Sequence, residues 1–344
     1  MARRRGGAGA WNRTTRLLGL AALLACPALA MAQFDYNAYG VADLSWGRFE
    51  PSGSLKDNRF NSNSLSASFA GVNAKDALDG GWTPGITLET FLRFQDFATG
   101  RKPNDPLLSR NAFVSLGSDY GTIRAGRLQS TLFDTTVRFN ALGNAIAFSP
   151  ALRHVFQSGN IEGVQGDFYW DRAVSYSTPN FDGLTVNTMF AKGQAAHRGD
   201  YSGASIVWAH GLFAGALSAQ RVHLNDGFVD PTEENALQAG ATYDFGVARV
   251  FGEATWTRDI GLEVRSHVFS AGAAIPLGPG TLELQGAVTR ATGSAIDRKH
   301  SSGSAAWLYP YDSQTDLYVA AMDDRVRGQT RGLSSAVGIR HKFD

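Results

Sequence analysis

The sequence predicts an all-β protein, and more narrowly a 16-stranded antiparallel transmembrane β-barrel. First, short stretches throughout the chain alternate between apolar and polar side chains, the period that a strand with two different faces requires. Second, short turns alternate with long polar loops, which is typical of a barrel with two unlike rims. Third, no apolar run beyond the N-terminal segment is long enough to cross a bilayer as a helix. A soluble β-sandwich is the alternative, but it has no need to gather its long loops at one end.

Residues 1–32 are predicted to be a secretory signal that is cleaved after Ala32. Five arginines lie between residues 3 and 16. They precede the apolar run LLGLAALLACPALAMA, which ends in a small-residue A-x-A pattern. A charged region, a short apolar region and such a pattern define a signal peptide. A lipoprotein signal ending at Cys26 is the second interpretation; we rank it lower because Pro27 follows that cysteine directly.

The exported part, residues 33–344, is expected to form a single barrel. Cleavage removes Cys26, the only cysteine, so neither disulfides nor thiolate chemistry are expected. It also removes five positive charges and no negative ones, which changes the formal net charge from +1 to −4. A general nucleic-acid-binding protein would carry a basic patch or stripe, so no nucleic-acid partner is expected.

The first strands show the alternation clearly. Within residues 34–46, Leu44 and Trp46 belong to an apolar parity, and the other parity is mostly polar. The stretch 64–69 alternates in the same way, and on the strand that returns from it Glu89 and Arg93 lie on the more polar face. In a membrane barrel such side chains line a wet lumen, whereas in a soluble sandwich they would form the solvated face.

The same pattern resumes after residue 170 and continues to the C-terminus. Turns such as TPNFDG, DFG and PLGPG separate alternating strands, and the chain ends on SSAVGIRHKF. The pattern predicts sixteen strands in eight hairpins. An even strand number favours a membrane barrel, because closing the sheet removes the unpaired edges that a bilayer could not satisfy.

Residues 129–170 follow neither the strand period nor a strong helical one. A connection of this length is more often functional or disordered than passive, and composition alone leaves both alternatives open. Just before it, Arg124 and Arg127 fall on opposite parities of one strand. Gly126 offers a break at which the backbone can bend and re-aim Arg127.

Five motifs resemble the Gram-negative general porins, most closely the neisserial and Burkholderia or Bordetella type. They occur in order along nearly all of the exported chain: Tyr39-Gly40-x-x-Asp43, RNAFVSLGSDYGTIRAGR at 110–127, SYSTPNFDGL at 175–184, TDLY at 315–318 and the ending AVGIRHKF. Each motif is weak by itself, but their combination and order are specific.

The resemblance implies an outer-membrane channel for the passive diffusion of small hydrophilic solutes and ions. It implies a homotrimer that assembles through the early strands and sits among outer-membrane lipid and lipopolysaccharide. It also implies that the third outer loop, here 129–170, folds inward as a constriction. No cofactor and no metal are expected. In such pores, charged side chains on the wall and at the constriction set selectivity.

The resemblance also points to the residues that line the pore. Arg127 matches the family's arginine before the inward loop, and Arg340 lies on the parity of the last strand opposite Ile339. The other expected members are Arg93 and Arg110 on the wall and, on the loop, the acids Asp134 and Glu162 and the bases Arg138 and Arg153. For each loop charge the alternative is a solvated loop tip.

The chain departs from the family pattern at three positions. Arginines that many relatives carry in the second strand and after the inward loop are absent, and the corresponding residues include Ser68 and Ser175. This thinner basic wall predicts a moderately selective pore. The chain also ends on Asp344 after Phe343, where the family ends on the aromatic residue.

Three other functions compete with a general porin. The seven histidines are scattered, and the sequence has no G-x-S-x-G elbow, phosphate-binding loop or dinucleotide motif, so we do not expect an enzyme. A barrel hydrolase and a barrel adhesin with a plugged lumen are therefore less favoured. A solute-specific uptake channel is the nearest alternative.

Overall fold

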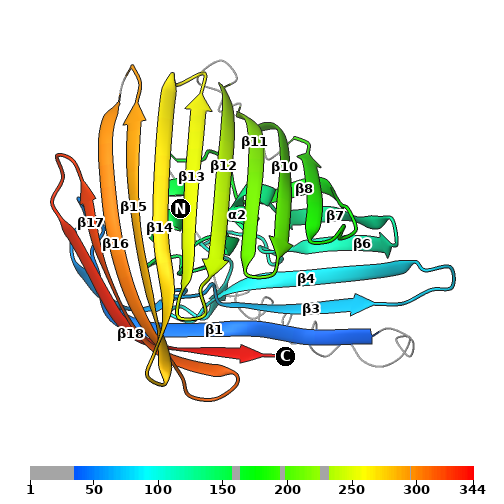
Figure 1. Ribbon diagram of the computed structural model, residues 1–344, viewed down its shortest axis with the longest axis horizontal. Helices are drawn as coiled ribbons and strands as arrows, with labels where there is room; N and C mark the ends of the chain where they lie inside the picture. Colours follow the sequence, from blue (N-terminus) through cyan, green and yellow to red (C-terminus); the bar gives the residue numbers. More distant parts are fainter. Residues whose placement is uncertain (1–34, 157–162, 194–197, 225–231, 295) are drawn as a thin grey trace, which may run out of the picture. The chain divides into compact units, whose positions relative to one another are not determined.

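Strands cover most of the chain in the computed structural model (Figure 1), which describes residues 35–156, 163–193, 198–224, 232–294 and 296–344. The predicted signal, residues 1–32 with Cys26, lies outside the described residues and stays a prediction. So does Glu162. Within the described residues, no helix is long and apolar enough to cross a bilayer.

Eighteen strand segments form one sheet in which neighbours pair antiparallel. The segments are β1 (Asp35–Phe49), β2 (Asp57–Ser62), β3 (Phe69–Lys75), β4 (Thr83–Arg93), β5 (Ala98–Thr99), β6 (Ala112–Ser118), β7 (Gly121–Gln129), β8 (Tyr169–Ser177), β9 (Leu184–Ala191), β10 (Arg198–His210), β11 (Phe213–Leu224), β12 (Thr232–Asp244), β13 (Arg249–Asp259), β14 (Val264–Leu277), β15 (Gly280–Thr292), β16 (Asp297–Pro310), β17 (Thr315–Val326) and β18 (Gly332–Phe343).

The sheet closes on itself because β18 pairs with β1, with Leu44 opposite Ile339. Both β2 and β3 pair with β1 and together form one interrupted wall strand. The two-residue β5 only extends the pairing of β4. The wall therefore has sixteen strands, and the predicted antiparallel barrel is confirmed.

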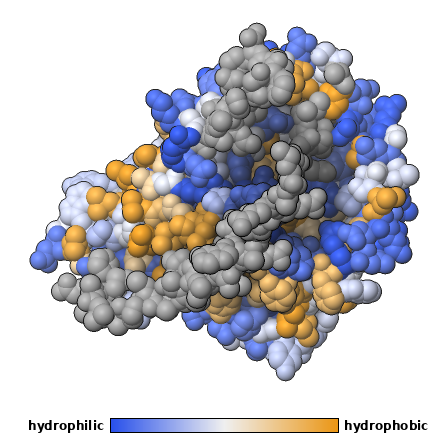
Figure 2. All heavy atoms as spheres, turned by 180° about the vertical axis from the view of Figure 1, so that it is seen from behind, coloured by the Kyte–Doolittle hydropathy of each residue, from blue (hydrophilic) through white to orange (hydrophobic). Residues whose placement is uncertain are grey.

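The two faces of the wall differ as the alternation predicted. On β12, Leu237 is 50% exposed while its neighbour Gln238 is fully buried; on β15, Val288 is 52% exposed and Thr289 is buried. Apolar side chains thus point outward and hydroxyl and amide groups point inward. In the view of Figure 2, hydrophobic residues gather in patches on the outer wall, and the hollow in its upper part is lined mostly by hydrophilic ones.

The two rims also differ. At the rim with the short turns, exposed aromatic residues flank the strand ends: Trp208, Phe213, Tyr243, Phe245 and Tyr311. The opposite rim carries the long connections 94–111 and 130–168, whereas its later connections 260–263 and 293–296 are short. The predicted asymmetry of the loops is therefore carried mainly by the first half of the barrel. In outer-membrane barrels the rim with the long loops faces the cell exterior.

The alternating stretch 64–69 does not form the predicted strand; only its last residue, Phe69, lies in a strand, β3. The buried Asp43 carboxylate accepts hydrogen bonds from the backbone N–H groups of Ser64, Leu65 and Ser66, at 3.2, 3.0 and 2.8 Å. These groups are thereby satisfied without a strand partner. The carboxylate of one strand thus creates the interruption between β2 and β3.

Candidate functional site

The long connection between β7 and β8 contains two short helices, α2 (Thr131–Arg138) and α3 (Pro150–Phe156). Ser130 caps α2: its Oγ accepts a hydrogen bond from the N–H of Phe133 at 3.3 Å. Asp134 lies in the first turn and Arg138 in the last, an arrangement that suits the helix dipole. We refer to residues 130–168 as the β7–β8 segment.

The strand β7 is irregular at Gly126, just before the segment, as the sequence predicted. Gly126 has φ +145°, and a Cβ there would lie 2.2 Å from the carbonyl oxygen of Ala112. The pairing of β7 with β8 shifts register between Gly126 and Leu128. Arg127 lies in this irregularity and is almost fully buried.

The first half of the segment contacts inward-facing side chains of the wall. Helix α2 contacts β9 to β12, consistent with its position behind these strands in Figure 1. Gln238 donates from Nε2 to Thr136 Oγ1 at 2.8 Å. Phe139 packs against Gly240 of β12; a Cβ on residue 240 would lie 2.9 Å from the Phe139 Cβ. The close approach therefore requires glycine on the wall.

The second half of the segment is attached in the same way to the wall strands that follow. Ser149 Oγ lies 3.1 Å from Gln285 Oε1, and the N–H of Ala147 donates to the carbonyl oxygen of Ser64 at 3.3 Å. Helix α3 contacts β14, β15 and β16. The segment thus has hydrogen-bonding contacts with inward-facing groups on several sides of the barrel.

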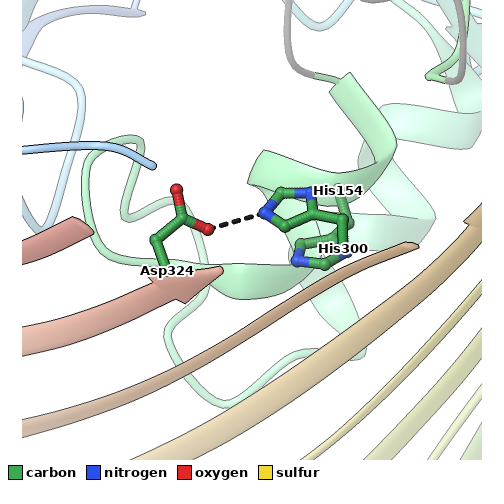
Figure 3. Close-up of side chains that lie close together, drawn as sticks. All are labelled: His154, His300 and Asp324. Atoms are coloured by element: carbon green, nitrogen blue, oxygen red, sulfur yellow. Dashed lines mark hydrogen bonds and ion pairs between the residues drawn. The ribbon is translucent and has the colours of Figure 1, made fainter. Parts of the chain in front are cut away.

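His154 anchors α3 through both of its ring nitrogens. Nδ1 lies 2.6 Å from Thr289 Oγ1 and Nε2 lies 2.7 Å from Ser302 Oγ. Figure 3 shows how the His154 ring lies against His300 and close to Asp324. The two rings stack with centroids 3.8 Å apart, and His300 Nε2 lies 2.6 Å from Asp324 Oδ1.

His154, His300 and Asp324 have potential metal-ligand atoms within 4.8 Å of one another, the one such group among the described residues. The hydrogen bonds, however, already engage both nitrogens of His154. Asp324 also has the Arg153 guanidinium at 3.5 Å and accepts from the N–H of Ser52 at 3.0 Å. This arrangement is that of a hydrogen-bonded anchor.

Burial is the main cause of an unusual protonation equilibrium at this anchor. It lowers the pKa of His154 well below 6.5, and the nearby His300 and Arg153 lower it further while Asp324 opposes them. The imidazole is therefore neutral at neutral pH. A neutral ring donates through one nitrogen and accepts through the other, which the two hydroxyl groups can match.

Each arginine predicted for the wall has an acidic partner. Arg127 donates from Nη1 to Asp171 at 2.6 Å and from Nε to the carbonyl oxygen of Ser109 at 3.0 Å. Arg340 donates to Asp316 at 2.7 Å. Two further arginines complete the set: Arg110 pairs with Glu89, and Arg93 pairs with Asp96.

The predicted loop charges behave differently from one another. Arg153 is buried beside Asp324, and this burial lowers its pKa. Arg138 is exposed at the end of α2, 5.8 Å from the ring of Phe139, with no acid within ion-pair distance among the described residues. Asp134 is open to solvent on α2 and accepts a hydrogen bond from Gln129.

Asp134 faces the basic side of the wall. Desolvation by the surrounding protein raises the pKa of Asp134 to about 6, while the hydrogen bond from Gln129 and the charges of Arg124 and Arg110 oppose that shift. Arg124 donates to Ser177 Oγ at 3.0 Å and, within the described part of the chain, has no acidic partner. Sequence reasoning noticed Arg124 but did not select it. Ile123 is exposed on the outer face, so the alternating position 124 faces inward. This parity is the signal that would have identified Arg124.

The comparison with known proteins points to one family. A sequence profile described as Gram-negative porin matches residues 19–329. The chain is 27% identical to outer membrane porin protein 32 of Delftia acidovorans, over 94% of this chain and 98% of that protein.

Solved structures agree on the fold. The anion-selective porin from Comamonas acidovorans has a TM-score of 0.77 and 21% identity, covering 90% of this chain and all of that one. A loop-deletion mutant of OmpT from Vibrio cholerae has a TM-score of 0.71 and 13% identity, covering 90% and 99%. OmpF of Salmonella typhi, in complex with daunomycin, has a TM-score of 0.61 and 14% identity, covering 90% of this chain and 97% of that one. The chain therefore belongs to the family of Gram-negative porins, outer-membrane barrels that form channels for passive diffusion.

Proposed function

We propose that the β7–β8 segment narrows the channel and that the opening beside it admits small hydrophilic solutes and ions with a modest preference for anions. The observation that carries this proposal is the pairing of charges inside the barrel. Rings or walls of charged side chains set selectivity in pores only to the extent that other charges leave them uncompensated.

The narrowing is supported by the contacts of the segment with inward-facing groups. Hydrogen bonds join Thr136 to Gln238, Ser149 to Gln285, and His154 to Thr289 and Ser302. A segment held at these points occupies part of the cross-section that the wall would otherwise leave to water. We infer that the remaining opening lies between α2 and the wall formed by β4 to β7, because there the charges of Arg124 and Arg110 act on Asp134.

The modest preference follows from which charges remain. Arg127, Arg110, Arg93 and Arg340 each have a carboxylate partner, so each pair adds little to the field at a distance. Two cations, Arg124 and Arg138, and one anion, Asp134, then dominate this opening. The excess of one positive charge favours anions weakly. That a structural relative is named anion-selective is in line with this.

The test is the reversal potential of single channels in planar bilayers under a potassium chloride gradient. Arg124→Glu and Arg138→Glu each reverse one uncompensated charge and should each move the preference towards cations. Lys299→Glu is the matched control, because Lys299 is exposed on the outward parity of β16, beside the inward-facing His300, and this change should leave the potential unaltered. Equal potentials for all four proteins would refute the proposed charge balance.

Conductance itself tests the channel. Purified, folded protein that gives no stepwise conductance would contradict the porin function. Saturable uptake of one solute class, competed by its analogues, would instead favour the solute-specific channel and contradict general diffusion.

We also infer that three copies assemble into a trimer through the early strands. The outward residues Trp46, Phe60 and Ile86 on β1, β2 and β4 are exposed apolar groups that a subunit contact would cover. A solved relative, OmpT of Vibrio cholerae, is described in a trimer form. Native mass spectrometry of the detergent-solubilised protein tests the stoichiometry, and a monomer under conditions that preserve the conductance would contradict it.

A further inference from the structure

The connection 94–111 at the long-loop rim contains an arginine that binds the β7–β8 segment. Arg101 donates from Nη1 to Asp167 Oδ1 at 2.8 Å and from Nη2 to Asp167 Oδ2 at 2.6 Å. Asp167 belongs to the C-terminal end of the segment, just before β8. Two parallel hydrogen bonds between a guanidinium and a carboxylate define both the distance and the orientation of the two groups. The connection is therefore attached to the segment in one specific geometry.

Asp105 of the same connection orients Arg101. The Asp105 carboxylate accepts a hydrogen bond from the backbone N–H of Arg101 at 2.9 Å, and the same oxygen lies 3.4 Å from Arg101 Nε. Gly100 has φ +86°, and a Cβ on residue 100 would lie 2.6 Å from the Asp105 Cβ, so this close approach requires glycine. The connection thus folds closely around the arginine, and both Nη groups remain for Asp167.

The ion pair between Arg101 and Asp167 is largely shielded from water. The two side chains are 24% and 25% exposed. Burial acts to raise the pKa of Asp167, but the hydrogen bond and the charge of Arg101 outweigh burial, so that the pKa is lowered. Asp167 is therefore ionised at neutral pH. A shielded pair of this kind holds its partners more firmly than an exposed one does.

Aromatic rings extend the contact from Arg101 to helix α2. The Arg101 guanidinium lies 5.0 Å from the ring centre of Phe168, within the range of a cation–π interaction. Phe168 in turn stacks on Phe133, with ring centres 4.6 Å apart and an angle of 11° between the planes. Phe133 is buried and belongs to α2. Arg101 therefore contacts the end of the segment directly and α2 through one intervening ring.

The same carboxylate lies beside Arg127, the arginine predicted for the constriction. Asp167 Oδ2 is 3.9 Å from Arg127 Nη2, whereas Arg127 Nη1 donates to Asp171 at 2.6 Å. Because Arg101 engages both oxygens of Asp167, Asp171 is the closer partner of Arg127. Without Arg101, Asp167 could turn toward Arg127 and neutralise more of its charge.

We propose that Arg101 is a positioning residue of the channel. It attaches the connection 94–111 to the β7–β8 segment and thereby holds α2, with its charged side chains, at a fixed distance from the wall. Arg101 acts through Asp167 and Phe168 and makes no contact with a solute. This role rests on the proposed function, in which the segment narrows the channel.

Hydrogen–deuterium exchange of the amides of α2, in the detergent-solubilised full-length protein, measures how firmly this helix is held. In Arg101→Ala the exchange should be about tenfold faster, because a charge-assisted pair is lost. Asp167→Ala should have an effect of the same size. The double variant should exchange no faster than either single variant, because all three lack the same contact.

Two further variants separate the contact from general effects. Arg101→Lys keeps the charge but cannot form both parallel hydrogen bonds, so its exchange should lie between those of the unaltered protein and Arg101→Ala. It also provides the test if Arg101→Ala does not fold. Arg331→Ala is the matched control: Arg331 forms a pair of the same geometry with Asp323 of β17, at 2.8 and 2.9 Å. Its loss should leave the exchange of α2 unaltered.

The reversal potential of single channels is a readout that a merely structural role would not change. Arg101→Lys retains the net charge, so a change in its potential reports a displacement of charged groups. We expect a shift toward cations, because Asp167 then shares its charge with Arg127.

The outcomes distinguish this role from the proposed function. Unchanged exchange in Arg101→Ala, an effect of the double variant equal to the product of the two single effects, or faster exchange in Arg331→Ala would each overturn the positioning role. Faster exchange of α2 in Arg101→Ala with an unaltered conductance and potential would show that Arg101 holds the helix. That result would instead contradict the narrowing of the channel by the segment.

Discussion

Acidification should release helix α3 from the wall, because the anchor at His154 tolerates no added charge. His154 is 2% exposed, its ring stacks on His300, and Arg153 belongs to the same helix. Among the residues that the structure describes, the acid beside it is Asp324, which is already engaged by His300, by Arg153 and by the N–H of Ser52. Thr289 and Ser302, its hydrogen-bonding partners, carry no charge.

The size of the effect follows from the direction of the shift. When the segment is released, His154 is solvated and has an ordinary pKa near 6.5; when it is docked, burial holds the pKa well below that value. Between these two values the released state binds a proton that the docked state does not. Docking therefore loses stability as the pH falls below about 6.5, by up to about 1.4 kcal/mol per pH unit, and the loss ends once the pH reaches the pKa of the docked state. Each unit thus reduces the ratio of docked to released segment by up to about tenfold.

Single-channel recording between pH 7.5 and pH 4.5 checks this prediction. Below pH 6.5, fluctuations between conductance levels should become more frequent in the unaltered protein. His154→Gln keeps one donor and one acceptor but cannot titrate, so its fluctuations should not change with pH. Acid-induced fluctuations that persist in His154→Gln, or that disappear only in His300→Gln, would refute the reasoning.

Two other predictions concern the same segment. Because the pKa of Asp134 is raised to about 6, its charge is lost as the pH falls through that value; the reversal potential should then shift toward anions between pH 7 and pH 5, and Asp134→Asn should show the anion-shifted value at both. Gly240→Leu places a side chain where even a Cβ lies 2.9 Å from the Phe139 Cβ, so it should cost about 1–3 kcal/mol and alter conductance. Gly252→Leu, where a Cβ meets nothing within 4 Å, should not; equal effects of the two substitutions would contradict close packing at Gly240.

The barrel could be predicted from the sequence because a period of two is a local property of each strand. It assigns Gln238 and Thr289 to the inner face and Leu237 and Val288 to the outer face without any knowledge of neighbours. The same reasoning failed at 64–69, where the distant Asp43 carboxylate captures the backbone N–H groups and prevents a strand. It also missed α2 and α3, which are too short to display a helical period.

The ion pairs inside the barrel could not be predicted from local sequence patterns. Arg127 and Arg340 stand out as inward arginines, but their partners Asp171 and Asp316 come from neighbouring strands whose register only the fold determines. A count of basic residues therefore overstates the positive field inside the barrel. That the predicted residues line the constriction stays a prediction, which the reversal potentials of the charge variants will test.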